Sequence, residues 1–172
     1  MAPCRCRSDQ GIAPYGVKWV KTMKNHPVRK WVRLREYDYS SDGAYFVTIC
    51  TDQKKHSLAR IVDRGPTEKP EIILTSIGEI IESYMKTIPG IDKYVIMPNH
   101  VHLILIKDNG KPLASDIRSF KGLSSKKAGV QIWQNSYYEH VIRDEEDYKT
   151  KWKYIDDNPA KWVKDEYYSA EP

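Results

Sequence analysis

Hydrophobic positions recur along the chain with two different spacings, and each spacing predicts one kind of element. The stretch AYFVTICT (44–51) is β-branched and aromatic, and it predicts a strand. SIGEIIESYMKTIPG (76–90) follows a helical spacing, with Ser76 and Glu79 as its expected capping box. The apolar face of this helix consists of Ile77, Ile80, Ile81, Tyr84 and Ile88. Between these two elements, TEKPEIILT (67–75) predicts a loop with a short strand at most.

The run YVIMPNHVHLILI (94–106) is the most apolar stretch of the chain, and Pro98 and Asn99 interrupt it. Since proline cannot donate a ladder hydrogen bond, one continuous central strand is unfavourable here. Two strands, YVIM and HVHLILI, joined by a tight Pro–Asn turn, account for the pattern. We therefore expect a β-hairpin over this run.

The second half of the chain predicts two more helices with one strand between them. KPLASDIRSFKGLSSKKAG (111–129) carries apolar residues at helical spacing, and IWQNSYYEHVIR (132–143) predicts extended chain. A last helix is expected to begin at Asp144, because acidic residues fill the first turn, where the helix dipole favours them. It is expected to end near Asn158, which precedes a proline.

The resulting order of elements is β-α-β-β-α-β-α. This is the split β-α-β pattern of a ferredoxin-like α+β sandwich, with one additional C-terminal helix. We expect a single antiparallel sheet with two helices covering one of its faces. Residues 1–29 lack sustained periodicity and predict a flexible basic tail, whereas residues 30–172 are long enough for one domain with its own core.

Two histidines stand out on the second strand of the predicted hairpin. His100 and His102 are two positions apart, so their side chains project from the same side of the strand. Val101, Leu103 and Leu105 take the other side, which we expect to face the helices. The open face of the sheet would then present two neighbouring imidazoles, which can hold one divalent ion when another element adds a ligand. Two half-exposed histidines on a solvated face are the alternative.

The last predicted helix carries a tyrosine that packing does not require. Tyr148, Trp152 and Ile155 cluster on one face, which we expect to be the core stripe of this helix. Tyr154 lies about 120–130° away from that stripe, and Asn158 is one turn further on nearly the same side. The residues alone do not select Tyr154 among the twelve tyrosines of the chain. Its formal rivals are Tyr137, Tyr138, Tyr148, Tyr167 and Tyr168.

Charge and composition narrow the choice of partners. Lys and Arg outnumber Asp and Glu by 28 to 23, and the net charge of +5 mildly favours an anionic partner. Twelve tyrosines and five tryptophans among these cations add a slight signal for single-stranded nucleic acid, and ordinary packing in the core and at the surface is the favoured alternative. No apolar run reaches the roughly 20 residues of a membrane-spanning helix, so we expect no membrane partner. Cys4, Cys6 and Cys50 form neither a CxxC pair nor an even framework, which favours a reducing cytoplasm.

The histidine stretch resembles the HUH signature (histidine, hydrophobic residue, histidine) of single-tyrosine transposases. Its form, MPNHVHLI, is typical of the REP-associated tyrosine transposases. YDYSSDGAYFVTICT, WQNSYYEHVIRDEEDY and KYIDDNPAKW resemble other blocks of that family and occur in the same order. The blocks together cover roughly residues 29–168. An HxH pair alone is a weak signal, whereas four ordered blocks are a specific one.

The resemblance implies an enzyme that cuts and transfers single-stranded DNA at sites beside hairpins or palindromes. His100 and His102 match the metal-binding histidines of the family, and Asn158 matches the residue that completes the metal site. The implied ion is Mg²⁺, with Mn²⁺ as a substitute. Tyr154 matches the nucleophile, which stays attached to the 5′-phosphate of the cut strand. Relatives act as monomers or homodimers, and the implied location is the bacterial cytoplasm, at the nucleoid.

Basic side chains are the candidate DNA contacts, and a solvated surface charge is the alternative for each of them. They are Arg29, Lys30, Arg33, Arg35, Arg118, Lys121, Lys126, Lys127, Lys151 and Lys161. His140 lies in one of the family blocks, where it either makes a structural hydrogen bond or takes part in catalysis. Two other functions stay open, namely a nucleic-acid-binding module without chemistry and a metal phosphoesterase that uses water.

Overall fold

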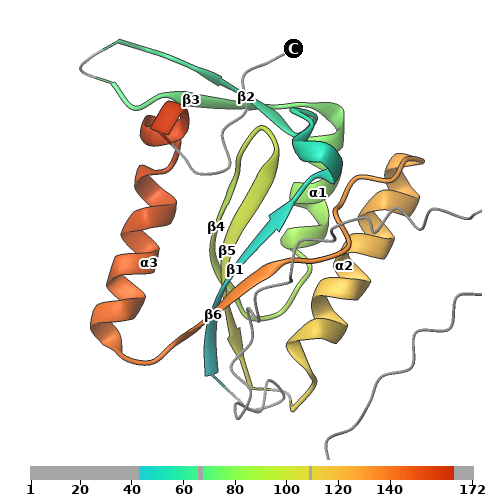
Figure 1. Ribbon diagram of the computed structural model, residues 1–172, viewed down its shortest axis with the longest axis vertical. Helices are drawn as coiled ribbons and strands as arrows, with labels where there is room; N and C mark the ends of the chain where they lie inside the picture. The colour runs from blue at the N-terminus through green and yellow to red at the C-terminus, as the bar shows by residue number, and fades with distance from the viewer. Residues whose placement is uncertain (1–42, 66–67, 109, 165–172) are drawn as a thin grey trace, which may run out of the picture. The chain divides into compact units, whose positions relative to one another are not determined.

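The computed structural model describes residues 43–65, 68–108 and 110–164, and these residues are built around one four-stranded sheet (Figure 1). The strands of this sheet are β1 (Gly43–Cys50), β4 (Ile91–Ile96), β5 (His100–Lys107) and β6 (Tyr138–Ile142). They are arranged in the order β4-β5-β1-β6, and each neighbouring pair is antiparallel. This is the strand order of a ferredoxin-like sandwich, as predicted. The predicted boundary between residues 29 and 30 lies outside the described residues.

Helices cover both faces of the sheet (Figure 1). α1 (Ser76–Met85) and α2 (Leu113–Ala128) pack on one face, and α3 (Glu145–Asp157) with the 3-10 turn η2 (Pro159–Lys164) packs on the other. The prediction of two helices on one face is therefore correct, but the histidine face is not open, because α3 lies over it. None of the helices in the described ranges is long and apolar enough to cross a membrane.

Each strand contributes alternate side chains to two apolar layers. The layer beneath α1 and α2 takes Val47 from β1 and Leu103 from β5, which face each other across the strand pair. Their neighbours Phe46 and Ile104 point the other way, into the layer beneath α3. The buried members of this second layer are Phe46, Val95, Met97, Ile104, Ile142, Ile155 and Trp162. The predicted alternation along β5 is thus confirmed.

A hairpin that the sequence pattern did not reveal lies between β1 and α1. After the 3-10 turn η1 (Asp52–Lys54), β2 (Ala59–Val62) and β3 (Glu71–Leu74) pair as a separate two-stranded sheet. We expected a loop with a short strand at most over residues 67–75, which β3 fits, whereas β2 and its pairing with β3 were not predicted. Each strand has only four residues, one of which is charged (Arg60 in β2 and Glu71 in β3), so neither strand shows a long apolar run. Ile61 and Ile72 pack partly buried against the layer beneath α3.

The N-terminus of α1 differs from the prediction by one residue. Thr75, and not Ser76, is the N-cap, and its Oγ1 accepts a hydrogen bond from the backbone N–H of Gly78 at 3.1 Å. Glu79 is therefore one position beyond the place that a capping box requires. Gly78 is also needed for packing, because a Cβ there would overlap the carbonyl oxygen of Leu58.

The turn before β5 and the ends of α3 agree with the prediction. The backbone N–H of Met97 donates to the carbonyl of His100 at 2.9 Å, which closes the predicted Pro–Asn turn. Asp144 caps α3, because its carboxylate accepts from the backbone N–H of Asp147 at 2.8 Å. Asn158 is the C-cap residue of the same helix. The two segments that carry the predicted site residues therefore begin and end where the sequence placed them.

Candidate metal and nucleophile site

His100 and His102 form a buried pair on β5. Both side chains are 0% exposed, and their Nε2 atoms lie 2.9 Å apart. We expected the pair on an open face of the sheet, so the expected exposure was wrong and the expected proximity was right. The alternative of two half-exposed histidines on a solvated face is wrong as well. The pair faces α3, because the alternation of β5 turns the apolar neighbours of the histidines toward α1 and α2.

Hydrogen bonds at the Nδ1 atoms fix the orientation of both imidazoles. His100 Nδ1 lies 2.8 Å from Asn99 Oδ1, and His102 Nδ1 lies 2.8 Å from the hydroxyl of Thr48 on β1. With both Nδ1 atoms engaged, the Nε2 atoms are the ones directed at the same point. The sequence analysis missed Thr48, although its register opposite His102 follows once β1 and β5 are paired.

The chemistry of this pair suits a divalent metal ion. Burial, with a smaller effect of His100, holds the pKa of His102 well below 6.5, so the imidazole stays neutral, as a metal ligand must be. Two ligand atoms at about 2.1 Å from one octahedral ion lie about 3 Å apart when they take neighbouring positions. The 2.9 Å between the two Nε2 atoms fits this requirement.

Further ligands would have to come from other kinds of group. Within residues 43–65, 68–108 and 110–164, no three His, Cys, Asp or Glu side chains are close enough together to hold a metal ion. The residue predicted from the family pattern, Asn158, is an amide and lies 2% exposed at the end of α3. Four residues later, the ring of Trp162 lies 5.8 Å from the ring of His100, measured between centroids. The chain that follows Asn158 therefore returns to the histidine pair.

Tyr154 reaches the histidine pair from α3. Its ring meets the ring of His102 edge-on, with the centroids 5.1 Å apart, and it meets the ring of Phe46 in the same way at 5.8 Å. Phe46 in turn stacks on His102 at 5.3 Å. Tyr154 is nevertheless 37% exposed, so one part of its side chain contacts the site and another part contacts solvent. The sequence analysis did not single out Phe46.

The predicted core stripe of α3 is only partly correct. Ile155 is buried, but Trp152 is 39% exposed, and Tyr148 is only partly buried. The side of α3 that contacts the sheet also includes Tyr154 and Lys151, whose Nζ lies 5.4 Å from the centre of the Phe46 ring. Trp152 misled the prediction because an indole is amphipathic and can lie at a surface.

The rival tyrosines of the described part of the chain lie elsewhere. Tyr148 donates its hydroxyl proton to Asp92 Oδ2 at 2.5 Å, and Tyr138 is 42% exposed on β6. Tyr137 packs partly buried in the layer beneath α1 and α2. Tyr167 and Tyr168 lie outside the described residues. Tyr154 is thus the described tyrosine whose ring lies against His102.

His140 makes a contact that joins β6 to α3. Its Nε2 lies 2.7 Å from Asp147 Oδ2, in the first turn of the helix. The same carboxylate oxygen accepts from the backbone N–H of Arg143 at 3.3 Å. Of the two roles considered for His140, this geometry favours the structural hydrogen bond.

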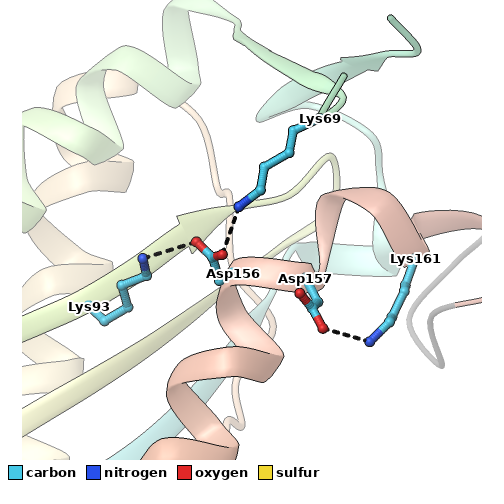
Figure 2. Close-up of polar contacts among 5 residues, drawn as sticks. All are labelled: Lys69, Lys93, Asp156, Asp157 and Lys161. Atoms are coloured by element: carbon cyan, nitrogen blue, oxygen red, sulfur yellow. Dashed lines mark hydrogen bonds and ion pairs between the residues drawn. The ribbon is translucent and has the colours of Figure 1, made fainter. Parts of the chain in front are cut away.

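The predicted DNA contacts are spread over several surfaces. Arg118, Lys126 and Lys127 are exposed on α2, across the sheet from the histidine pair. Lys161 forms an ion pair with Asp157 at 2.9 Å (Figure 2). Lys151 is the candidate that lies beside the site. Four candidates lie outside the described residues: Arg29, Lys30, Arg33 and Arg35.

Lys121, a predicted DNA contact, binds backbone carbonyl groups of the protein, which the sequence did not suggest. Its ammonium group donates to the carbonyls of Gln134 and Ser136 at 2.7 and 2.8 Å, and it lies 3.5 Å from that of Asn135. Burial lowers the pKa of Lys121 to about 8. Its amine therefore holds the segment that leads from α2 into β6.

Comparison with known proteins gives several relatives, although no family model matches the chain. An uncharacterised protein of Haemophilus influenzae is 31% identical over 173 residues, covering 81% of this chain and 93% of that protein. A REP-associated tyrosine transposase of Escherichia coli is 35% identical over 78 residues, covering 43% of this chain and 47% of that protein. A solved REP-associated tyrosine transposase bound to a REP hairpin is similar with a TM-score of 0.53 and 26% identity, over 75% of this chain and 73% of that one.

Proposed function

This chain belongs to the REP-associated tyrosine transposases of the HUH class, and on that premise we propose that it cuts and rejoins single-stranded DNA with a tyrosine nucleophile. The observation that carries the proposal is the edge-on contact between Tyr154 and His102, 5.1 Å apart between ring centroids. It places a partly exposed phenol beside a buried pair of imidazoles, of which that of His102 has its pKa lowered by burial. A tyrosine that served only as a surface residue of an amphipathic helix would not need this contact.

We assign the metal ligands to His100 and His102, with Asn158 as the third protein ligand. The bound ion, Mg²⁺ or Mn²⁺, would supply the positive charge that polarises the scissile phosphate. Thr48 and Asn99 orient the two imidazoles, and burial lowers the pKa of His102, which favours its neutral, ligating form. The three ligands carry no negative charge of their own, so they leave the charge of the ion uncancelled.

Tyr154 supplies the attacking oxygen. The phenol oxygen forms a bond to phosphorus, the bond from phosphorus to the 3′-oxygen breaks, and the proton of the phenol ends on that 3′-oxygen. The cut strand then has a free 3′-hydroxyl, and its 5′-phosphate is joined to Tyr154. Because the phosphotyrosine ester conserves the energy of the broken bond, the same steps in reverse join the strand to a new 3′-end. Neither direction needs a nucleotide cofactor.

We infer that the substrate is single-stranded DNA beside a hairpin or palindrome, as on the chromosome in the bacterial cytoplasm. Support comes from the similar transposase that was solved with a REP hairpin. Near the site, Lys151 carries positive charge beside Phe46 and is our first candidate for a backbone phosphate contact. The exposed cations of α2 lie on the other side of the sheet, so they could reach only a more distant part of the DNA.

The proposal is tested with 3′-end-labelled single-stranded DNA that carries hairpins from the genomic flanks of the gene. We expect wild-type protein with Mn²⁺ or Mg²⁺ to produce label that migrates with protein on a denaturing gel. Tyr154→Phe should lower this adduct at least about 1,000-fold, since the nucleophile is absent. Tyr138→Phe, which removes a similarly exposed hydroxyl from β6, should leave it unchanged.

The other outcomes separate the alternatives. Adduct that persists in Tyr154→Phe would move the nucleophile to another tyrosine. Metal-dependent cleavage without adduct would identify a phosphoesterase that uses water. DNA binding without cleavage in either metal would favour a nucleic-acid-binding module.

A further inference from the structure

Three side chains on α3 form a stripe that contacts the edge strand β4 through polar groups. Tyr148, Trp152 and Asp156 are spaced by four residues, so they lie along one side of the helix. Tyr148 donates to Asp92 at 2.5 Å, and the Nζ of Lys93 lies 3.7 Å above the centre of the Trp152 ring. The same Nζ is 3.3 Å from Asp156 Oδ1. Two consecutive residues of β4 therefore hold three successive turns of α3.

A β-bulge makes this arrangement possible. In a regular strand, Asp92 and Lys93 would point to opposite faces of the sheet. Here Ile91 pairs with Leu105 and Lys93 pairs with Ile104, so Asp92 is an extra residue in β4. The bulge changes the alternation and turns both polar side chains toward α3.

The packing of the neighbouring residues supports the bulge independently. Ile91 and Tyr94 both pack in the layer beneath α1 and α2, although they are three positions apart. In a regular strand, residues three positions apart face opposite sides of the sheet. The alternation must therefore be interrupted by one residue between them. Asp92 and Lys93 are the residues in that interval.

We propose that Lys93 is a positioning residue for Tyr154, holding the turn of α3 that carries the nucleophile over His102. Lys93 contacts the Trp152 ring, two residues before Tyr154, and the Asp156 carboxylate, two residues after it. Figure 2 shows the contact with Asp156. One cation thereby fixes both flanks of the nucleophile. The role of Tyr154 as a nucleophile rests on the proposed function. Its placement by Lys93 rests on the contacts of Lys93 alone.

Lys93 is suited to this task because apolar packing holds α3 only weakly. Ile155 is the one buried residue among the thirteen of α3, whereas α2 buries Leu113, Ile117, Phe120 and Ser124. The Lys93 side chain is itself only 24% exposed, so its ion pair is screened less than a surface pair would be. Lys69, from the β2–β3 connection, also binds Asp156 at 2.8 Å, but its side chain is 79% exposed (Figure 2).

The test compares three variants in single-turnover adduct formation at saturating DNA. Lys93→Met removes the charge and keeps most of the stem, and it should lower the rate about tenfold through misplacement of Tyr154. Lys93→Arg keeps a cation that can stack on Trp152 and should restore the rate to within about threefold of wild type. Lys149→Met is the matched control, because the Lys149 amine pairs with Glu145 within α3 itself. It should retain the wild-type rate.

Two results in this assay would overturn the proposal. A wild-type rate for Lys93→Met at saturating DNA, together with weaker DNA binding, would make Lys93 a DNA contact. A slow rate in Lys93→Met that Lys93→Arg does not restore, with an equal loss of thermal stability in both, would make it a general structural residue. We expect the DNA dissociation constant of Lys93→Met to stay within about twofold of wild type, because its partners are protein groups.

A measurement that needs no activity separates this proposal from the proposed function. In histidine-labelled protein, the ring signals of His102 report on the aromatic ring of Tyr154 beside it. Lys93→Met should move these signals in the same direction as Tyr154→Leu, and Lys149→Met should leave them in place. Unchanged His102 signals in Lys93→Met would overturn the positioning role. If wild type forms no adduct but the signals move as expected, the proposed function fails and the positioning role stands.

Discussion

Thr48 Oγ1 and His102 Nδ1 lie 2.8 Å apart across the β1–β5 pair, and both side chains are buried. A hydrogen bond at Nδ1 holds the ring so that its Nε2 faces His100. The Thr48 hydroxyl on β1 would therefore determine that Nε2, and not Nδ1, of His102 on β5 binds the proposed metal ion.

Thr48→Val removes this hydroxyl and keeps the shape of the side chain. We expect Mn²⁺ affinity, measured by calorimetric titration, to fall about 10- to 100-fold, because an outer partner of a ligand is lost. Thr87→Val is the control, since the Thr87 hydroxyl donates to the carbonyl of Tyr84 at the exposed end of α1. Equal Mn²⁺ affinity in Thr48→Val and wild type would show that the hydroxyl does not orient His102.

Mn²⁺ should stabilise the folded protein through His100 and His102. At a concentration 100 times the dissociation constant, binding raises the free energy of unfolding by about 2.7 kcal/mol. Thermal denaturation with and without a chelator measures this shift. His100→Ala and His102→Ala should each abolish it, whatever their own stability. A shift that persists in both variants would place the ion elsewhere.

Two glycines in helices should respond to alanine in opposite directions. Gly78→Ala should lower the free energy of unfolding by about 2 kcal/mol, because the new Cβ overlaps the backbone carbonyl of Leu58. Gly122→Ala in α2 meets no atom within 4 Å, so it should raise that free energy by about 0.5–1 kcal/mol. Urea denaturation of both variants checks the pair. Stabilisation by both would mean that α1 does not lie this close to Leu58.

The lowered pKa of Lys121 predicts a pH dependence of stability. Burial lowers the pKa from 10.5 to about 8, so between these values the unfolded chain binds the proton more tightly than the folded chain. The free energy of unfolding therefore rises with pH in that window. From about pH 7.5 to about pH 9.5 we expect wild type to gain about 1 kcal/mol relative to Lys121→Met, after allowance for partial exposure of the amine.

Urea denaturation at both pH values measures this difference. Lys121→Met should be less stable than wild type at each pH, because the carbonyls of Gln134 and Ser136 lose their donor. Parallel pH profiles for the two proteins would show that the Lys121 amine titrates normally.

Most of the fold follows from the spacing of apolar residues. β1, the β4–β5 hairpin, α1, α2 and α3 each coincide with a predicted element, because each has one clearly apolar side or a clear cap. The β2–β3 hairpin does not follow, since its four-residue strands bury only part of one face against the rest of the protein. Whether such short strands form and pair depends on tertiary contacts, which the spacing of apolar residues does not reveal.

The proximity of the candidate site residues was predictable from the sequence, whereas the groups that surround them were not. The HxH pair and the family blocks placed His100, His102 and Tyr154 correctly near one another. The burial of the pair was not predicted, because the side of α3 that meets the sheet carries Tyr154 and Lys151 in place of a full apolar stripe. The bulge at Asp92 leaves no mark in the hydrophobic pattern, so the contacts of Lys93 could be found only in the structure.

The order of the elements along the chain also sets the order in which the site is made. β5, with both histidines, precedes α2, β6 and α3, and the tyrosine comes in the last of these helices. A ribosome therefore completes the imidazole pair while the phenol has still to be synthesised. On the proposed function, the nascent chain would therefore carry both histidines well before it carries Tyr154, and the proposed nucleophile would join the protein only when almost all of the described fold has been synthesised.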